Sequence, residues 1–103
     1  MTYIPPSDVK SPKASWVLLD VIYNGGAGEH AVAVGEWDER RVLAMRWNGH
    51  GDNAIGNPQS RGIPTWFILP ERYNEKVLEA FSAEDLPQQK RMIARALLGL
   101  GQE

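Results

Sequence analysis

The stretch HAVAVGEWDERRVLAMRW, residues 30–47, decides the fold, because two short apolar runs flank one tight turn. Runs of this length that are rich in Val and Trp, over 30–37 and 41–47, predict two β-strands. Asp38 and Glu39 stand between them, where the chain must reverse. We therefore expect an antiparallel hairpin whose turn is centred on these two acidic residues.

That turn determines which residues face each other. The expected pairs are His30 with Trp47, Val32 with Met45, and Val34 with Leu43. The run SWVLLDVIY at 15–23 precedes the hairpin through a glycine-rich turn at 24–29, and we expect Tyr23 opposite His30. Because side chains alternate strictly along a strand, both hairpins then bury one common face. Its members are Val17, Leu19, Val21, Tyr23, Val32, Val34, Leu43 and Met45.

The rest of the chain supplies a fourth strand and two helices. PTWFIL at 64–69 predicts a strand that lies either beside the first strand or beyond the third. Downstream, apolar residues recur at helical spacing. The first predicted helix carries Tyr73, Val77, Leu78 and Phe81, and the second carries Met92, Ile93, Ala96, Leu97 and Leu100. Pro87 suits the first turn of the second helix, and Gly99 or Gly101 suits its C-terminal cap.

These elements predict an α+β fold. We expect a four-stranded, mainly antiparallel sheet with two C-terminal helices packed on one face, in the order ββββαα. A chain of 103 residues fits one domain. Residues 1–14 contain three prolines and are expected to form an extended N-terminal lead-in to a single α+β domain at 15–103.

The composition excludes several classes of protein. The chain has no cysteine, which rules out a disulfide framework and thiolate zinc sites. No apolar run approaches the roughly 20 residues that span a bilayer, so we expect a cytoplasmic protein without a membrane partner. A net charge of −2 argues against broad polyanion binding. We expect neither a cofactor nor a metal.

The opposite face of the predicted sheet is apolar, where a solvated face would carry Lys, Glu and Thr. If exposed, it would be a partner surface, and we expect a homodimer through Trp16, Leu18 and Trp37. The alternative is that the N-terminal segment or the long loop folds over it. Asp20 lies on this face and needs a partner if buried, for which Arg46 is the expected one.

A polar, glycine-rich segment at 48–62 separates the third and fourth predicted strands. Long loops in compact domains often carry function, so we expect a binding or accessory protein that meets a small ligand or a protein partner here. The expected ligand contacts are Trp47, Asn48, His50, Asp52 and Arg61. The structural alternative is that the Asn, Gly and Pro residues serve as turn formers alone.

A second interpretation of the same residues is a small phosphoester hydrolase or nuclease. His30 and His50 would act as acid and base. Asp52 would orient one imidazole, and Arg61 would hold the phosphate. The chain has only two histidines and no metalloprotease, P-loop or nucleophile-elbow motif, so an enzyme is the less favoured interpretation.

A third interpretation is nucleic-acid binding through Arg61, Trp66 and the basic side of the last helix. That side carries Lys90, Arg91 and Arg95. Basic helices are more often solvated surface helices whose cations lie near the negative end of the helix dipole. Nucleic acid is therefore not the favoured partner.

The motif RWNG at 46–49, followed by GNPQSRGIPTWFILP at 56–70, resembles small uncharacterised bacterial proteins of mobile gene cassettes and accessory genomic regions. The resemblance covers residues 34–70. It implies a small bacterial accessory protein in the cytoplasm. It brings no activity, cofactor or catalytic residue with it, so the candidate sites rest on the residues alone.

Overall fold

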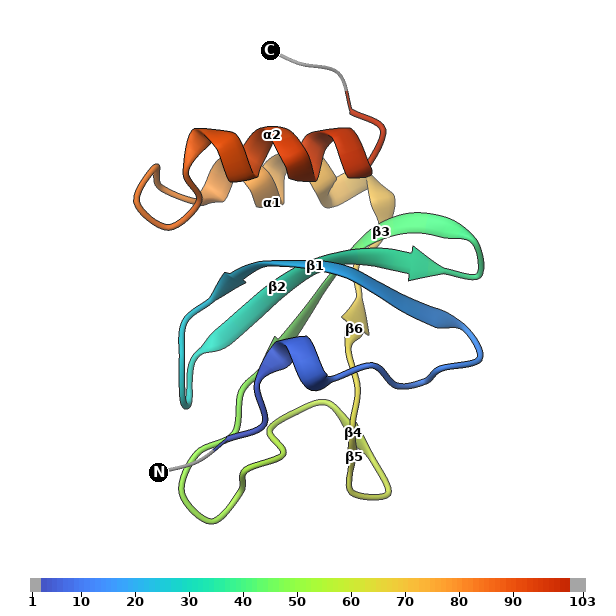
Figure 1. Ribbon diagram of the computed structural model, residues 1–103, viewed down its shortest axis with the longest axis vertical. Coiled ribbons are helices and arrows are strands. Elements are labelled where there is room, and N and C mark those ends of the chain that lie inside the picture. The colour runs from blue at the N-terminus through green and yellow to red at the C-terminus, as the bar shows by residue number, and fades with distance from the viewer. Residues whose placement is uncertain (1–2, 101–103) are drawn as a thin grey trace.

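The structure, a computed structural model that describes residues 3–100, has two layers: an antiparallel sheet and a pair of helices (Figure 1). The sheet has the strand order β1-β2-β3-β6, and a separate hairpin pairs β4 with β5. The strands are β1 (Trp16–Asn24), β2 (His30–Trp37), β3 (Arg40–Trp47), β4 (Gln59–Ser60), β5 (Ile63–Pro64) and β6 (Phe67–Ile68). The helices are α1 (Asn74–Ala80) and α2 (Gln88–Leu97), with 3₁₀ turns η1 (Pro6–Asp8) and η2 (Glu71–Tyr73). The predicted α+β fold is confirmed.

The β2–β3 hairpin has the register predicted from its turn. The observed pairs include His30 with Trp47, Val32 with Met45, and Val34 with Leu43. Asp38 and Glu39 adopt φ angles of 51° and 72°. Positive φ at both central residues is the requirement of a type I′ turn, whose twist matches the strands that it joins.

The register of β1 against β2 differs from the predicted one. The predicted pairing of Tyr23 with His30 is wrong, because two β-bulges each add one residue to β1. Each extra residue reverses the direction in which the following side chains point. Val17 and Leu19, predicted to be buried, are 51% and 39% exposed, whereas Ile22 is buried beneath the helices. The structure therefore removes three predicted members from the helix-side core: Val17, Leu19 and Val21.

The fourth strand of the sheet lies beyond β3, where β6 pairs Phe67 with Met45. This is one of the two positions that the sequence left open. The strand predicted over 64–69 is shortened to the two residues of β6, because β5 turns back to pair with β4. The loop predicted at 48–62 therefore ends in a small hairpin.

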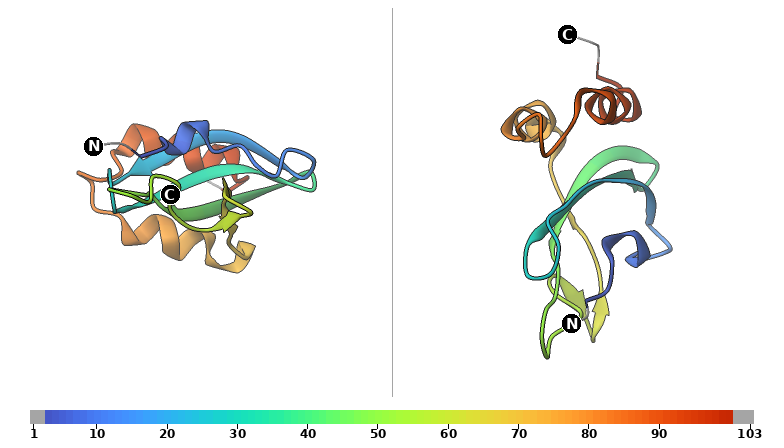
Figure 2. Two further views of the ribbon diagram at one scale, coloured as in Figure 1. Left: turned by 90° about the horizontal axis from the view of Figure 1, so that it is seen from below. Right: turned by 60° about the vertical axis from the view of Figure 1, so that its left-hand side comes forward.

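The two helices lie side by side over one face of the sheet (Figure 2). Hydrogen bonds from Arg91 and Arg95 of α2 to α1 hold the pair together. The buried core between the helices and the sheet consists of Ile22, Val32, Val34, Leu43, Leu78, Leu86 and Ala94. Tyr23, Met45 and Phe81 pack at its margin.

The buried side of α2 differs from the apolar stripe predicted for this helix. Met92 and Ile93, predicted to face the core, are 40% and 47% exposed. The buried residues of the helix are Ala94 and Arg95. Because Arg91 and Arg95 both bond to α1, the arginine side of the helix is turned inward.

The C-terminus of α2 has the cap predicted at Gly99, which adopts a φ of 77°. Its N–H donates to the carbonyl of Ala96, and the N–H of Leu100 donates to the carbonyl of Arg95. These two bonds form a Schellman motif. Gly101, the alternative cap, lies outside the described residues.

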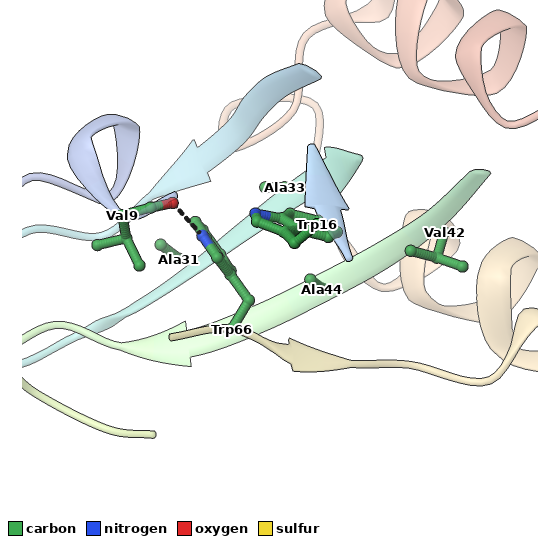
Figure 3. Close-up of a cluster of buried hydrophobic side chains, with 7 residues drawn as sticks. All are labelled: Val9, Trp16, Ala31, Ala33, Val42, Ala44 and Trp66. Atoms are coloured by element: carbon green, nitrogen blue, oxygen red, sulfur yellow. Dashed lines mark hydrogen bonds between the residues drawn. The ribbon is translucent and has the colours of Figure 1, made fainter. Parts of the chain in front are cut away.

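The other face of the sheet is covered by the chain itself (Figure 3). Val9, which follows η1, and Trp66 both pack against it, and Trp66 Nε1 donates a hydrogen bond of 2.7 Å to the Val9 carbonyl. The buried members of this cluster are Val9, Trp16, Ala31, Ala33, Val42, Ala44 and Trp66. This is the alternative that the sequence left open, in which the N-terminal segment folds over the face.

Glu75 contributes a pH-dependent part of the stability. Arg95 Nη1 donates a hydrogen bond of 2.6 Å to Glu75 Oε1, and this bond lowers the pKa of the Glu75 carboxyl below its ordinary value. A carboxyl with a lowered pKa stabilises the fold above its unfolded-state pKa, and that stability is lost as the pH falls through the folded-state pKa. We expect Glu75→Gln to lower the melting temperature at neutral pH and to match the wild-type protein in acid.

Thermal melts followed by circular dichroism, from neutral pH into acid, measure this difference. Glu79→Gln is the control, because Glu79 is 62% exposed and forms only a surface pair with Lys76. A Glu75→Gln deficit that stays constant through the titration would contradict the assignment.

Candidate functional site

The helices leave one end of the sheet uncovered. At that end β2 begins and β3 finishes, away from the helix layer (Figure 1). Two large apolar side chains there are more than half exposed, Trp47 at 57% and Phe67 at 59%. Both line a first cavity of about 580 Å³, a volume typical of ligand sites. The other residues in its walls are His30, Met45, Arg46, Asn57 and Pro58.

Strand pairing positions the walls of the first cavity. His30 and Trp47 are directly opposite each other in the β2–β3 ladder, with ring centroids 5.9 Å apart and ring planes at 66°. Met45 pairs with Phe67 on β6. Because alternate residues of a strand point to the same face, Met45 and Trp47 both face this side of the sheet. These four walls are therefore set by the backbone ladder.

A second cavity of about 570 Å³ lies between the sheet and α1. His30 and Met45 line both cavities. From His30 the row of rings continues to Tyr23, 5.0 Å away, and from Tyr23 to Phe81 at 5.2 Å. We call the two cavities together the aromatic groove, whose principal walls are Tyr23, His30, Met45, Trp47, Phe67 and Phe81.

Arg46 holds the segment that follows β3, and it is only 2% exposed. Its guanidinium donates hydrogen bonds to the carbonyl oxygens of Ile55, Pro58 and Thr65. A planar guanidinium carries five N–H donors and can therefore bond several carbonyls at once. Burial lowers the pKa of Arg46 below its ordinary value. The residue thus ties the loop to the segment that leads into β6.

Asn48 holds the other side of the loop and is 3% exposed. Its side-chain Nδ2 donates to Asn24 Oδ1 at 2.9 Å and to the carbonyl oxygen of Gly26 at 2.8 Å. Its backbone N–H donates to the carbonyl oxygen of Glu29 at 2.8 Å. These bonds join the loop to the β1–β2 turn, so Asn48 serves as a structural anchor.

Gly56 is a further requirement of this packed segment. It has a φ of 73°, and a Cβ there would overlap the carbonyl oxygen of Trp47 and lie 2.7 Å from the nitrogen of Gly49. Gly62 has a similar φ of 80° but open space around it. We expect Gly62→Ala to cost about 1 kcal/mol through backbone strain. Gly56→Ala should cost about 3 kcal/mol, because strain and steric overlap combine.

Urea denaturation of the two alanine variants measures this difference. The variants share the substitution and the left-handed backbone, so only the surrounding space differs between them. Equal losses of stability would mean that the loop does not pack against β3 as described.

The structure separates the residues predicted to form the site. Trp47 lines the first cavity, and His30 lines both cavities. His50, Asp52 and Arg61 are exposed and lie outside the walls of both. His50 and Asp52 occupy a tight turn, and Arg61 occupies the turn of the β4–β5 hairpin. The two imidazoles and the guanidinium required for hydrolysis therefore do not line a common cavity.

Two predictions about charged residues are wrong. The Asp20–Arg46 pair is not formed, because the bulges in β1 turn Asp20 toward α2, where it pairs with Lys90 at 3.4 Å. The basic side of α2, predicted to be solvated, is bonded within the protein. Arg91 donates to backbone carbonyls, and Arg95 pairs with a glutamate of α1.

Four groove residues were not identified as such from the sequence. Tyr23 and Met45 were predicted to belong to the closed core, Phe67 only to a strand, and Phe81 to the apolar face of the first helix. One signal was present: the predicted strands place the rings of Tyr23, His30 and Trp47 at the same end of the sheet. What the sequence did not reveal is that the helices stop short of that end.

The surface predicted for a homodimer is largely occupied by the chain itself. Trp16 is 2% exposed and its ring centroid lies 6.2 Å from that of Trp66. Leu18 and Trp37 are partly buried against the same cluster. Self-association stays a prediction, and the expected surface would have to displace the N-terminal segment.

No protein-family model, curated protein or solved structure matches this chain. Among residues 3–100, no group of three or more His, Asp or Glu side chains could hold a metal ion. Within the same range, no helix is both long enough and apolar enough to cross a membrane.

Proposed function

We propose that the protein is a small bacterial accessory protein of the cytoplasm that binds an apolar ligand in the aromatic groove. The observation that carries this proposal is the exposure of Trp47 and Phe67 in the walls of a ligand-sized cavity. An exposed apolar patch around a cavity is the usual mark of a binding site. The resemblance of residues 34–70 to bacterial accessory proteins supports the cellular setting.

The loop at 48–62 has a supporting role in this function. It contributes Asn57 and Pro58 to the wall of the first cavity. Arg46 holds that wall through its bond to the Pro58 carbonyl. The polar tip around His50 is outside the cavity walls, so recognition uses the root of the loop rather than its tip.

An apolar ligand fits the groove better than a phosphoester does. The first cavity has mainly aromatic and aliphatic walls, and the guanidinium of Arg46 is already bonded to carbonyls. Arg61 is outside the described walls. A phosphate in this cavity would lack the cation that phosphate recognition normally requires. Nucleic acid is disfavoured too, because its binding requires several cations along the phosphate backbone.

A neutral apolar dye tests this proposal. N-phenyl-1-naphthylamine carries no charge and fluoresces strongly in apolar surroundings. We expect saturable binding to the wild-type protein and roughly tenfold weaker binding to Trp47→Ser and to Phe67→Ser, because each loses one aromatic wall. Both side chains are more than half exposed, so both variants should fold.

Ile93→Ser is the matched control. It removes a 47% exposed apolar side chain from α2, outside the groove, and should bind the dye as the wild-type protein does. Dye binding that survives both groove substitutions would refute the proposed function. An equal loss of dye affinity in Ile93→Ser would also refute it.

A further inference from the structure

The two cavities of the aromatic groove are neighbours that share two walls. His30 and Met45 line both of them, and the volumes are about 580 and 570 Å³. Each cavity alone is large enough for a small ligand, so a ligand that occupies both would be longer than a small molecule. It runs from Trp47 at the root of the loop to the flank of α1, where Val77 and Ala80 line the second cavity.

The groove lies where a further helix would extend the helical layer. An apolar sheet face is normally covered by packed elements. Here α1 and α2 cover one end of the face and leave the other end bare (Figures 1 and 2). Ala80 is exposed on the flank of α1, and its small side chain allows another helix to approach closely.

The charges at the rim indicate what kind of partner fits. The charged side chains that line the second cavity are Lys76 and Asp85, which have opposite signs. Lys76 is 82% exposed and pairs with Glu79 only at 3.4 Å, a surface interaction that contributes little. It can therefore bind a carboxylate of a partner. A polyanion would need several cations, whereas an amphipathic peptide needs one acidic group here.

We infer that the aromatic groove binds an amphipathic helix of a protein partner, laid beside α1. Its apolar stripe would cross both cavities, and an acidic residue would meet Lys76. Anchors at i, i+3 or i+4, and i+7 of such a helix span about 10 Å, the reach of two helical turns. This inference rests on the proposed function and names the class of its ligand.

A displayed library of random peptides, each of about 16 residues or four helical turns, tests the inference when selected on the immobilised full chain. We expect enriched peptides to carry large apolar residues at helical spacing and an acidic residue toward one end. An enriched peptide should gain helical circular dichroism on binding. Its affinity should fall about tenfold in Ala80→Arg, because the long side chain fills the second cavity.

Ala83→Arg is the matched control, with the same change of charge at an exposed position outside the groove walls. It should bind the peptide as the wild-type protein does. It should also retain binding of the neutral dye, since no residue of either cavity is changed. The dye tests the proposed function and the selected peptide tests the inference, so the failure of one can be told from the failure of the other.

Several results would overturn the inference. Dye binding without any enriched peptide would leave the proposed function standing and remove the helical partner. A peptide that binds Ala80→Arg as tightly as it binds the wild-type protein would also rule out a helical partner in the second cavity. Salt-sensitive binding of a fluorescein-labelled single-stranded oligonucleotide that depends on Trp47 would assign the groove to nucleobases instead.

Discussion

Replacing Trp66 by alanine is expected to lower the free energy of unfolding by about 3–5 kcal/mol, the usual cost of truncating a buried aromatic residue. Trp66 is 5% exposed and packs 6.2 Å from Trp16. Its Nε1 donates to the Val9 carbonyl at 2.7 Å, so the substitution also leaves a buried acceptor unpaired. Because small domains are stable by only about 5–15 kcal/mol, this is a large share of the total.

Urea denaturation followed by far-ultraviolet circular dichroism measures the loss. Trp66→Phe separates packing from hydrogen bonding and should cost about 1–3 kcal/mol, mainly from the unpaired Val9 carbonyl. Trp47→Ala is the control for the type of side chain, because it removes a tryptophan that is 57% exposed. It should cost less than about 1 kcal/mol. If Trp66→Ala were as stable as Trp47→Ala, Trp66 and the N-terminal segment would not pack on the sheet face opposite the helices as described.

The second large effect is expected from Arg46→Met, which should lower the free energy of unfolding by about 3 kcal/mol. Methionine has a similar reach but no donor, so the carbonyls of Ile55, Pro58 and Thr65 lose their common partner. The loop wall of the first cavity should loosen as a result. We therefore expect dye binding to weaken together with stability.

Amide hydrogen exchange locates this effect along the chain. Asn57 N–H donates to the Trp47 carbonyl at 3.0 Å, and its exchange should accelerate in Arg46→Met. Arg61→Met is the matched control, since it makes the same substitution at an exposed arginine of the loop that Arg46 anchors. It should change stability by less than about 0.5 kcal/mol. Unchanged exchange at Asn57 in Arg46→Met would contradict the anchoring role.

The β2–β3 hairpin could be predicted, because its register depends only on the residues of one short turn. Asp38 and Glu39 form a two-residue turn that leaves one register for β2 and β3. The bulges of β1 could not be predicted, because adjacent residues at both sites are apolar. Leu18 and Leu19 suit either face, so an inserted residue leaves no mark in the hydrophobic pattern. The bulges then explain why Asp20 meets Lys90.

The groove could be predicted only in part, for a similar reason. The sequence identified Trp47 and His30 at the root of the loop, because strand pairing fixes their positions. It gave no measure of how far the helices extend over the sheet, so Met45 and Phe67 were not recognised as walls. The polar composition of the loop predicted ligand contacts at its tip. The hydrogen bonds of Arg46 and Asn48 show instead that much of the loop is packed structure.

The most direct test of the proposed binding site is the location of a bound apolar probe. Nuclear magnetic resonance of ¹⁵N-labelled protein resolves the indole N–H groups of the four tryptophans. During a titration with N-phenyl-1-naphthylamine, we expect shifts at the Trp47 indole and at the amides of His30 and Phe67. The indoles of Trp16 and Trp66 should not move, because both are buried on the opposite face.

The contrary result is equally specific. Shifts centred on the loop tip, with the Trp47 indole unmoved, would place recognition outside the aromatic groove. The residues that would then report binding are His50, Asp52 and Arg61. That outcome would contradict the proposal that the groove is the binding site. It would assign ligand binding to the polar residues of the loop instead.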